Sequence, residues 1–209
     1  MSNYLCMSWQ GFLQQVVYQV SRGYLFYCLV EYREDKRDKW MTTDKKLIRK
    51  YQTDLSKDQR YRRKAKHLSN FVFLRWDKWA VILHTVGTID VDKYDDIFHA
   101  IDTRPLELRL NLCYRVHTGA KGEVTVHLTR DSYRGTKASL DHSIFQRRRD
   151  MLIKEFNQLN GLPCWGGIVQ QKSQLLEHIL RKAGKFGIKV KRGDFRFTTR
   201  RAIYEVFEK

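Results

Sequence analysis

Two runs rich in β-branched and aromatic residues stand almost back to back near the middle of the chain. They read NFVFLRW (70–76) and WAVILHT (79–85), and only Asp77 and Lys78 separate them. So short a connection allows the chain to reverse only as a hairpin of antiparallel strands. The pair therefore predicts an antiparallel sheet at the centre of the fold, although glycine is more typical of such a turn than lysine.

Three further segments have the character of strands. YLFYCLVEY (24–32) is short and apolar, which predicts a buried strand in the middle of a sheet. PLELRLNLCYRVHT (105–118) and EVTVHLT (123–129) flank the loop GAKG, and the leucines of the first run alternate with polar residues. Such alternation is typical of a sheet with one face toward water, so we expect a second hairpin here.

Apolar residues recur at helical spacing in six other stretches. They predict helices over 7–20, 43–51, 57–68, about 91–101, 138–160 and 166–183. Together with the strands, these helices indicate an α+β fold, built on a mainly antiparallel sheet with helices packed on it.

The length of 209 residues suits one domain, or one domain with an appendage. We expect residues 1–137 to form the sheet domain, with a basic helical insertion at 41–68. Residues 138–209 should form a helical part that ends in a basic hairpin, packed on the first part as one unit. A helix followed by a basic hairpin at 188–199 has the outline of a winged helix.

Charge is the feature that says most about a partner. The chain holds 40 Lys and Arg against 23 Asp and Glu, a formal net charge of +17. Residues 33–66 hold 14 basic and 6 acidic side chains, and residues 147–201 hold 14 and 4, whereas residues 90–107 hold 2 and 6. Two basic blocks thus flank one acidic patch.

Clustered arginine and lysine indicate nucleic acid, because neutralising phosphates releases counterions and raises affinity. We therefore expect a protein that binds duplex DNA through two basic surfaces, a property that would suit replication, recombination or regulation of a mobile element. A plain solubility charge is the alternative. The candidate contacts are Arg60, Arg62, Arg63, Lys64, Arg147, Arg148, Arg149, Lys189, Lys191, Arg192, Arg196, Arg200 and Arg201.

The two helices over 43–68 allow a helix-turn-helix interpretation, in which the second helix presents its cations to the major groove. Tyr61, Ala65 and Leu68 follow helical spacing and are expected to pack, which would leave the arginines on the other faces exposed. The connection lacks the usual glycine, so contact with phosphates alone is the simpler hypothesis. Trp76 and Trp79 are candidates for stacking on bases, or else they close the end of the sheet.

Two alternatives concern the acidic patch and RNA. Asp92, Asp96 and Glu107 are the best local ligands for Mg²⁺, so the runner-up is a magnesium-dependent DNA endonuclease. Acidic residues also favour helix N-termini for reasons of the dipole alone. An RNA-binding module is the third hypothesis, without a motif to support it. The leading hypothesis needs no cofactor.

The remaining features concern location. Four widely spaced cysteines without a C-x-x-C pair indicate reduced thiols. The longest clearly apolar run, 24–30, is too short to span a bilayer, and the first residues lack the basic start of a signal peptide. These features predict a cytoplasmic protein without a membrane partner.

Overall fold

The computed structural model describes residues 4–89, 94, 96–120 and 122–208 and has two compact units. The first unit consists of Met1–Leu106, His117–Val124 and Tyr204–Lys209, and the second consists of Glu107–Val116 and Thr125–Ile203. Helices and antiparallel sheets both contribute, so the predicted α+β class is confirmed.

A four-stranded sheet forms the centre of the first unit, in the order β2-β3-β1-β4. The strands are β1 (Phe26–Glu31), β2 (Phe71–Trp76), β3 (Trp79–His84) and β4 (His99–Ala100). The β2–β3 hairpin and the internal place of β1 confirm the prediction. Asp77 adopts a φ of 49°, which aspartate tolerates well, and so the turn forms without glycine.

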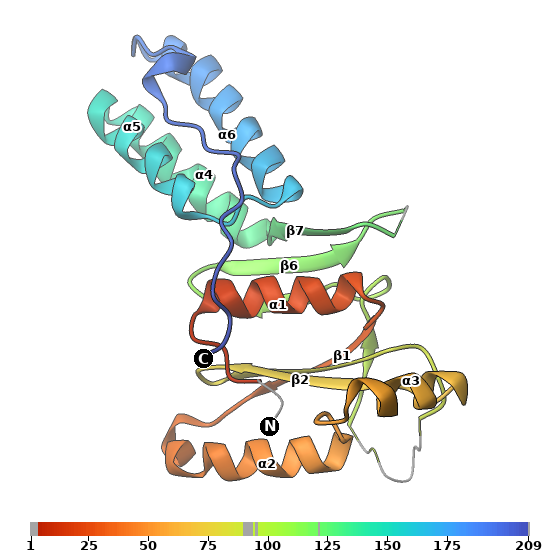
Figure 1. Cartoon of the computed structure of the whole chain (residues 1–209). Helices are drawn as coiled ribbons and strands as arrows, with labels where there is room; N and C mark the ends of the chain where they lie inside the picture. Colours follow the sequence, from red (N-terminus) through yellow and green to blue (C-terminus); the bar gives the residue numbers. More distant parts are fainter. Residues whose placement is uncertain (1–3, 90–93, 95, 121, 209) are drawn as a thin grey trace. The chain divides into compact units, whose positions relative to one another are not determined.

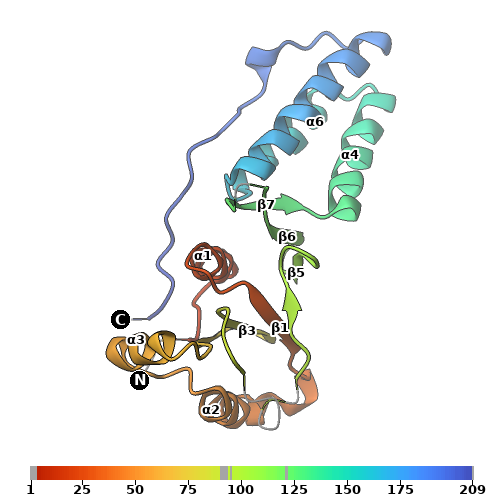
Figure 2. The ribbon, with the colours of Figure 1, turned by 90° about the vertical axis from the view of Figure 1, so that its right-hand side faces the viewer.

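Helices α1 (Trp9–Ser21) and α2 (Trp40–Tyr51) lie on opposite faces of this sheet (Figures 1 and 2). Phe71 and Phe73 of β2 belong to the cluster that also holds buried residues of α2. Both faces are therefore covered, which explains why these strands are apolar almost throughout instead of alternating.

Two further elements of the first unit are the 3₁₀ helix η1 (Glu34–Lys39), which precedes α2, and helix α3 (Lys57–Ala65). Ser56 caps α3, with a reciprocal hydrogen bond from its backbone N–H to Gln59. The helix expected over about 91–101 is wrong where it can be checked, because residues 96–98 are not helical and β4 follows. Residues 90–93 and 95 lie outside the described part of the chain.

The second sheet has the order β5-β6-β7, with β5 (Leu106–Arg109), β6 (Cys113–Thr118) and β7 (Val124–Leu128). The loop between β6 and β7 falls where it was predicted, but the run 105–118 contains two strands separated by a turn instead of one. The helices that follow are α4 (Arg130–Phe145), α5 (Arg149–Gln158), the 3₁₀ turn η2 (Leu159–Gly161) and α6 (Gly166–Lys185).

The helix predicted over 138–160 is broken in the middle. Arg147 adopts a left-handed φ of 55°, and Arg148 N–H bonds to Ser143 O while Arg147 N–H bonds to Ile144 O. This pattern is a Schellman motif, which usually carries glycine at the left-handed position. The sequence offers arginine there, so nothing in it marked the break. The boundary expected at residue 137 falls inside α4.

The basic hairpin expected over 188–199, and with it the winged-helix outline, is not what forms. The segment contains the 3₁₀ turn η3 (Arg192–Asp194) and, among its described residues, no paired strand. Its apolar side chains still point inward, since Ile188 and Phe195 belong to the core of the second unit. We call residues 186–203 the tail, and it runs beside the helices of its unit (Figure 1).

The backbone of the tail bonds to side chains of the helices and not to another strand. Arg196 N–H donates to Asn157 Oδ1 at 2.7 Å, and Thr198 N–H donates to Asn160 Oδ1 at 2.8 Å. Asn160 Nδ2 in turn donates to Arg196 O at 2.8 Å. These amides meet the hydrogen-bonding needs of a single extended segment, so a second strand is not required.

The predictions about location were based on the cysteines and on the lack of a membrane-spanning segment. Cys6, Cys28, Cys113 and Cys164 are free thiols. Across the described residues, no helix combines the length and the apolar character that crossing a bilayer requires.

Candidate nucleic-acid interface

Helix α3 is held to the first unit by two arginines. Arg60 donates hydrogen bonds from Nε to Leu55 O at 3.1 Å and from Nη2 to Thr53 O at 2.6 Å. Arg63 donates from Nε and from Nη2 to Ser69 O, at 3.2 and 2.8 Å. Both guanidinium groups are therefore turned toward the protein and serve as anchors.

The face of α3 that was predicted to pack is the face that meets solvent. Tyr61 is 75% exposed and Ala65 is also exposed, so the prediction that they anchor the helix with Leu68 is wrong. The physical reason is that loop carbonyls lie within reach of Arg60 and Arg63. Hydrogen bonds from a charged donor are stronger than neutral ones, and they fix the rotation of the helix.

The same rotation leaves other cations of α3 exposed. The side chains of Arg62 and Lys64 form no hydrogen bond or ion pair with another residue in the described ranges. Lys57 and Lys66, at the two ends of the helix, are likewise exposed. Of the four cations predicted to bind nucleic acid here, two hold the helix in place and two face solvent beside Tyr61.

Adjacent arginines of α3 should therefore behave differently on substitution. Arg63→Ala should lower the free energy of unfolding by about 1–3 kcal/mol, because Ser69 O loses both of its guanidinium donors. Arg62→Ala should change it by less than about 0.5 kcal/mol, as is usual for an exposed side chain. Urea denaturation of the two variants measures the difference, and equal effects would contradict the anchoring role.

Cations gather at one end of the second unit, where the start of α5, the end of α6 and the start of the tail meet. Arg149 Nε donates to Lys189 O at 3.1 Å. Both residues line a pocket of about 610 Å³ together with Gly184 and Lys191. We call this region the helical tip, and its cations are Arg147, Arg148, Arg149, Lys185, Lys189, Lys191 and Arg192.

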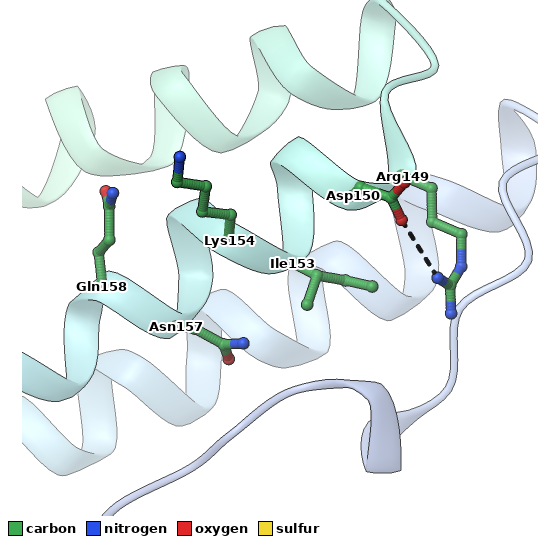
Figure 3. A pocket seen from close by; sticks show the side chains of 6 residues that line it. All are labelled: Arg149, Asp150, Ile153, Lys154, Asn157 and Gln158. Atoms are coloured by element: carbon green, nitrogen blue, oxygen red, sulfur yellow. Dashed lines mark ion pairs between the residues drawn. The ribbon is translucent and has the colours of Figure 1, made fainter.

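Arg149 is the structural member of the helical tip. Figure 3 shows it reaching from the first turn of α5, at the end of an open hollow of about 680 Å³ that follows this helix. Its guanidinium lies 3.0 Å from Asp194 Oδ2 and 3.5 Å from Asp150 Oδ1. The backbone N–H of Lys191 and the charge of Arg149 lower the pKa of Asp194. Arg149 therefore joins α5 to the tail and is not a free cation.

Other cations of the helical tip are exposed. The side chains of Arg147, Arg148, Lys185 and Lys189 have no hydrogen-bonding or ion-pairing partner within the part of the chain that the structure describes. The structure thus brings together two clusters that are about forty positions apart in the sequence. That convergence depends on the turn between α4 and α5 and on the course of the tail.

Three predicted contacts lie farther along the tail. Arg196 is exposed beside the end of α5, where its backbone bonds to Asn157. Arg200 is exposed, and the guanidinium of Arg201 lies 4.2 Å from the ring centroid of Trp165, just before α6. The basic block 147–201 is therefore divided between the two ends of α6.

A buried lysine holds the middle of the tail. Lys172 of α6 is 1% exposed, and its Nζ donates to Thr198 O at 2.9 Å and to Asn160 Oδ1 at 3.1 Å. Burial lowers the pKa of this amine, an effect partly offset by the nearby thiol of Cys164. Sequence reasoning missed this residue because a lysine at an apolar position of a helix is normally exposed.

The buried amine should make the stability of the second unit depend on pH. Since the pKa is lower in the folded state than in the unfolded chain, the unfolded chain binds more protons between the two values. The free energy of unfolding should therefore rise with pH in that window and level off above it. Denaturation at pH 7–10, compared with Lys172→Met, measures this contribution; identical pH profiles would contradict it.

The two candidate stacking residues lie opposite each other at the end of the β2–β3 hairpin. Trp76 pairs with Trp79 in the antiparallel register, and both are partly exposed. Lys78 Nζ lies 5.4 Å from the ring centroid of Trp79 and 2.8 Å from Glu31 Oε1. A cross-strand aromatic pair stabilises a hairpin by itself, so stacking on bases stays a prediction.

The candidate magnesium ligands have other partners where they are described. Lys50 Nζ lies 2.6 Å from Asp96 Oδ2 in the first unit, and Arg115 lies 3.3 Å from Glu107 in the second. Asp92 is outside the described residues. Within the described ranges, no three His, Cys, Asp or Glu side chains are grouped so that they could hold a metal ion. The endonuclease hypothesis stays a prediction.

Comparison of the chain with protein-family models, with curated proteins and with solved structures finds no significant match.

Proposed function

We propose that the chain binds duplex DNA through two basic surfaces, the solvent face of α3 in the first unit and the helical tip in the second. The phosphate backbone would supply most of the affinity, because the exposed cations are numerous. Cations that hold the fold together, such as Arg60, Arg63 and Arg149, are excluded from this role.

The observation that carries the proposal is the surplus of exposed cations after internal pairing is taken into account. Arg62 and Lys64 on α3, and Arg147, Arg148 and Lys189 on the helical tip, have no side-chain partner among the described residues. Cations without carboxylate neighbours are available to phosphate oxygens, and each contact releases a condensed counterion.

The geometry of α3 favours duplex over single-stranded nucleic acid. A helix whose rotation is fixed by Arg60 and Arg63 can lie along a groove or a backbone as a rigid body. The exposed Ala65 beside Arg62 leaves room for close approach. Whether this face reads bases or only phosphates decides sequence specificity, and phosphate contact is the simpler expectation.

Affinity for a duplex as a function of salt tests the proposal directly. The logarithm of the binding constant should fall linearly with the logarithm of salt concentration, with a slope of about 0.9 for each phosphate contacted. Fluorescence anisotropy with a labelled duplex gives this slope. A flat response, or no binding at low salt, would overturn the proposal.

A competition experiment shows whether the partner is DNA or RNA. Unlabelled duplex DNA should displace the labelled duplex at lower concentration than single-stranded RNA of the same length. Preferential displacement by RNA would replace the proposed partner with RNA, since RNA-binding surfaces usually read splayed bases in single strands.

A further inference from the structure

A pocket of about 390 Å³ lies in the first unit, where the end of β1, η1 and the first turns of α2 meet. Ligand pockets commonly have volumes of about 300–1,000 Å³, so this one can hold a small molecule or the end of a chain. None of the residues predicted to bind nucleic acid lines it. The pocket is therefore a separate site from the two basic surfaces.

Cations dominate the wall of this pocket. Arg33, Lys36, Lys39 and Lys46 line it, against a single carboxylate, Glu31. Glu31 is already paired with Lys78 at 2.8 Å, and Arg33 is paired with Asp35 at 2.7 Å.

The other three cations of the wall are Lys36, Lys39 and Lys46. Within the residues that the structure describes, their ammonium groups form no hydrogen bond or ion pair. Three like charges around one hollow repel one another, and an anion placed between them would relieve that repulsion.

The start of α2 contributes no negative charge to the pocket. The helix begins at Trp40 without a side-chain cap and without an acidic residue in its first turn. Lys39 joins it directly to η1, whose acidic residues Glu34 and Asp35 do not line the pocket. Thr42 also lines the pocket, and a threonine hydroxyl can donate to an oxygen ligand.

The floor of the pocket is rigid and apolar. Tyr32 and Trp40 pack edge to face, with ring centroids 5.9 Å apart, and both are buried. Tyr32 OH donates to Asp44 Oδ1 at 2.8 Å, and Trp40 Nε1 donates to Arg33 O at 2.9 Å. The charge of the buried Asp44 beneath this floor is balanced by a buried arginine, so the floor does not repel an anion.

We propose that this pocket binds the phosphomonoester of a nucleotide, with Lys36, Lys39 and Lys46 holding the phosphate and the side chains of Val30 and Tyr32 against the sugar. The nucleotide is either free or the 5′ end of a DNA strand. The second source rests on the proposed function, whereas the first does not.

Calorimetric titration with a nucleoside monophosphate, the matching nucleoside and inorganic phosphate tests the pocket itself. The monophosphate should bind at least about tenfold more tightly than the nucleoside, the equivalent of about 1.4 kcal/mol. It should also bind more tightly than inorganic phosphate, which has no sugar to contact Val30 and Tyr32. Equal affinity for monophosphate and nucleoside would overturn the inference.

A matched pair of double variants assigns the binding to the pocket. Lys39→Gln/Lys46→Gln removes two charges from the wall and should weaken monophosphate binding by about tenfold or more. Lys45→Gln/Arg49→Gln removes two exposed charges from the same helix but outside the pocket, and it should change affinity by less than about twofold. Equal losses in the two variants would overturn the inference.

Duplexes with and without a 5′ phosphate then identify the source of the nucleotide. Tighter binding of the phosphorylated duplex, lost in Lys39→Gln/Lys46→Gln, would assign the pocket to strand ends. Equal binding of both duplexes would refute strand ends while leaving DNA binding intact. If neither duplex binds but the monophosphate does, the result supports nucleotide binding by the pocket and refutes the proposed binding of duplex DNA.

Discussion

Replacing Asp44 with alanine should lower the free energy of unfolding of the first unit by about 3–5 kcal/mol. Asp44 is fully buried, and its carboxylate accepts hydrogen bonds from Arg75 Nε at 3.0 Å and from Tyr32 OH at 2.8 Å. Arg75 is only 5% exposed, so alanine at position 44 would leave a guanidinium charge buried without its partner. Urea denaturation followed by far-UV circular dichroism measures the loss.

Two further variants show whether burial of the pair is the cause. Asp35→Ala breaks an exposed pair with Arg33 in the same unit and should change stability by less than about 1 kcal/mol. The double variant Asp44→Leu/Arg75→Met removes both charges and should be more stable than Asp44→Ala alone. A loss below about 1 kcal/mol in Asp44→Ala would contradict this account.

The triple variant Arg148→Gln/Lys189→Gln/Lys191→Gln should weaken binding to duplex DNA by a factor on the order of 10² at about 0.1 M salt. The three side chains are exposed on the helical tip, whereas the side chain that joins α5 to the tail is that of Arg149. If each contacts one phosphate, the magnitude of the salt slope should also fall by about 2–3. Anisotropy titrations over a range of salt concentrations measure both quantities.

A control with the same loss of charge comes from the first turns of α4. Arg130→Gln/Arg134→Gln/Lys137→Gln lowers the net charge equally but leaves the helical tip intact. Its affinity should fall much less than that of the tip variant, and its salt slope should barely change. If both variants lose affinity equally, net charge and not the helical tip determines binding.

Much of the fold could be predicted because apolar periodicity carries strong information in this chain. The hairpin 71–84, the strand 26–31, and the helices α1, α2 and α6 all come from runs whose pattern allows one interpretation. The break between α4 and α5 could not be predicted, since Arg147 takes a left-handed conformation that usually marks glycine. Asp44 was expected near a helix start, whereas α2 begins earlier and turns that carboxylate into the core.

The candidate site was harder to predict than the fold because the pattern of charge does not separate anchors from free cations. Periodicity assigns arginine to solvent and tyrosine to the interior, yet Arg63 bonds to a loop carbonyl while Tyr61 is exposed. Only the course of the backbone decides which guanidinium groups meet carbonyls. The tail shows the same limit. Its apolar residues Ile188 and Phe195 reach the core, yet its backbone bonds to helix side chains and not to the second strand of the predicted hairpin.

That bonding has a consequence for the order in which the second unit assembles. The amide and ammonium groups that hold the tail belong to Asn157, Asn160 and Lys172, which take up their positions only when α5, η2 and α6 have formed and docked. We therefore expect the tail to become ordered only after these helices have docked. Its amide protons should exchange in step with opening of the helices, as one cooperative foldon, and not as the independently fraying end of a chain.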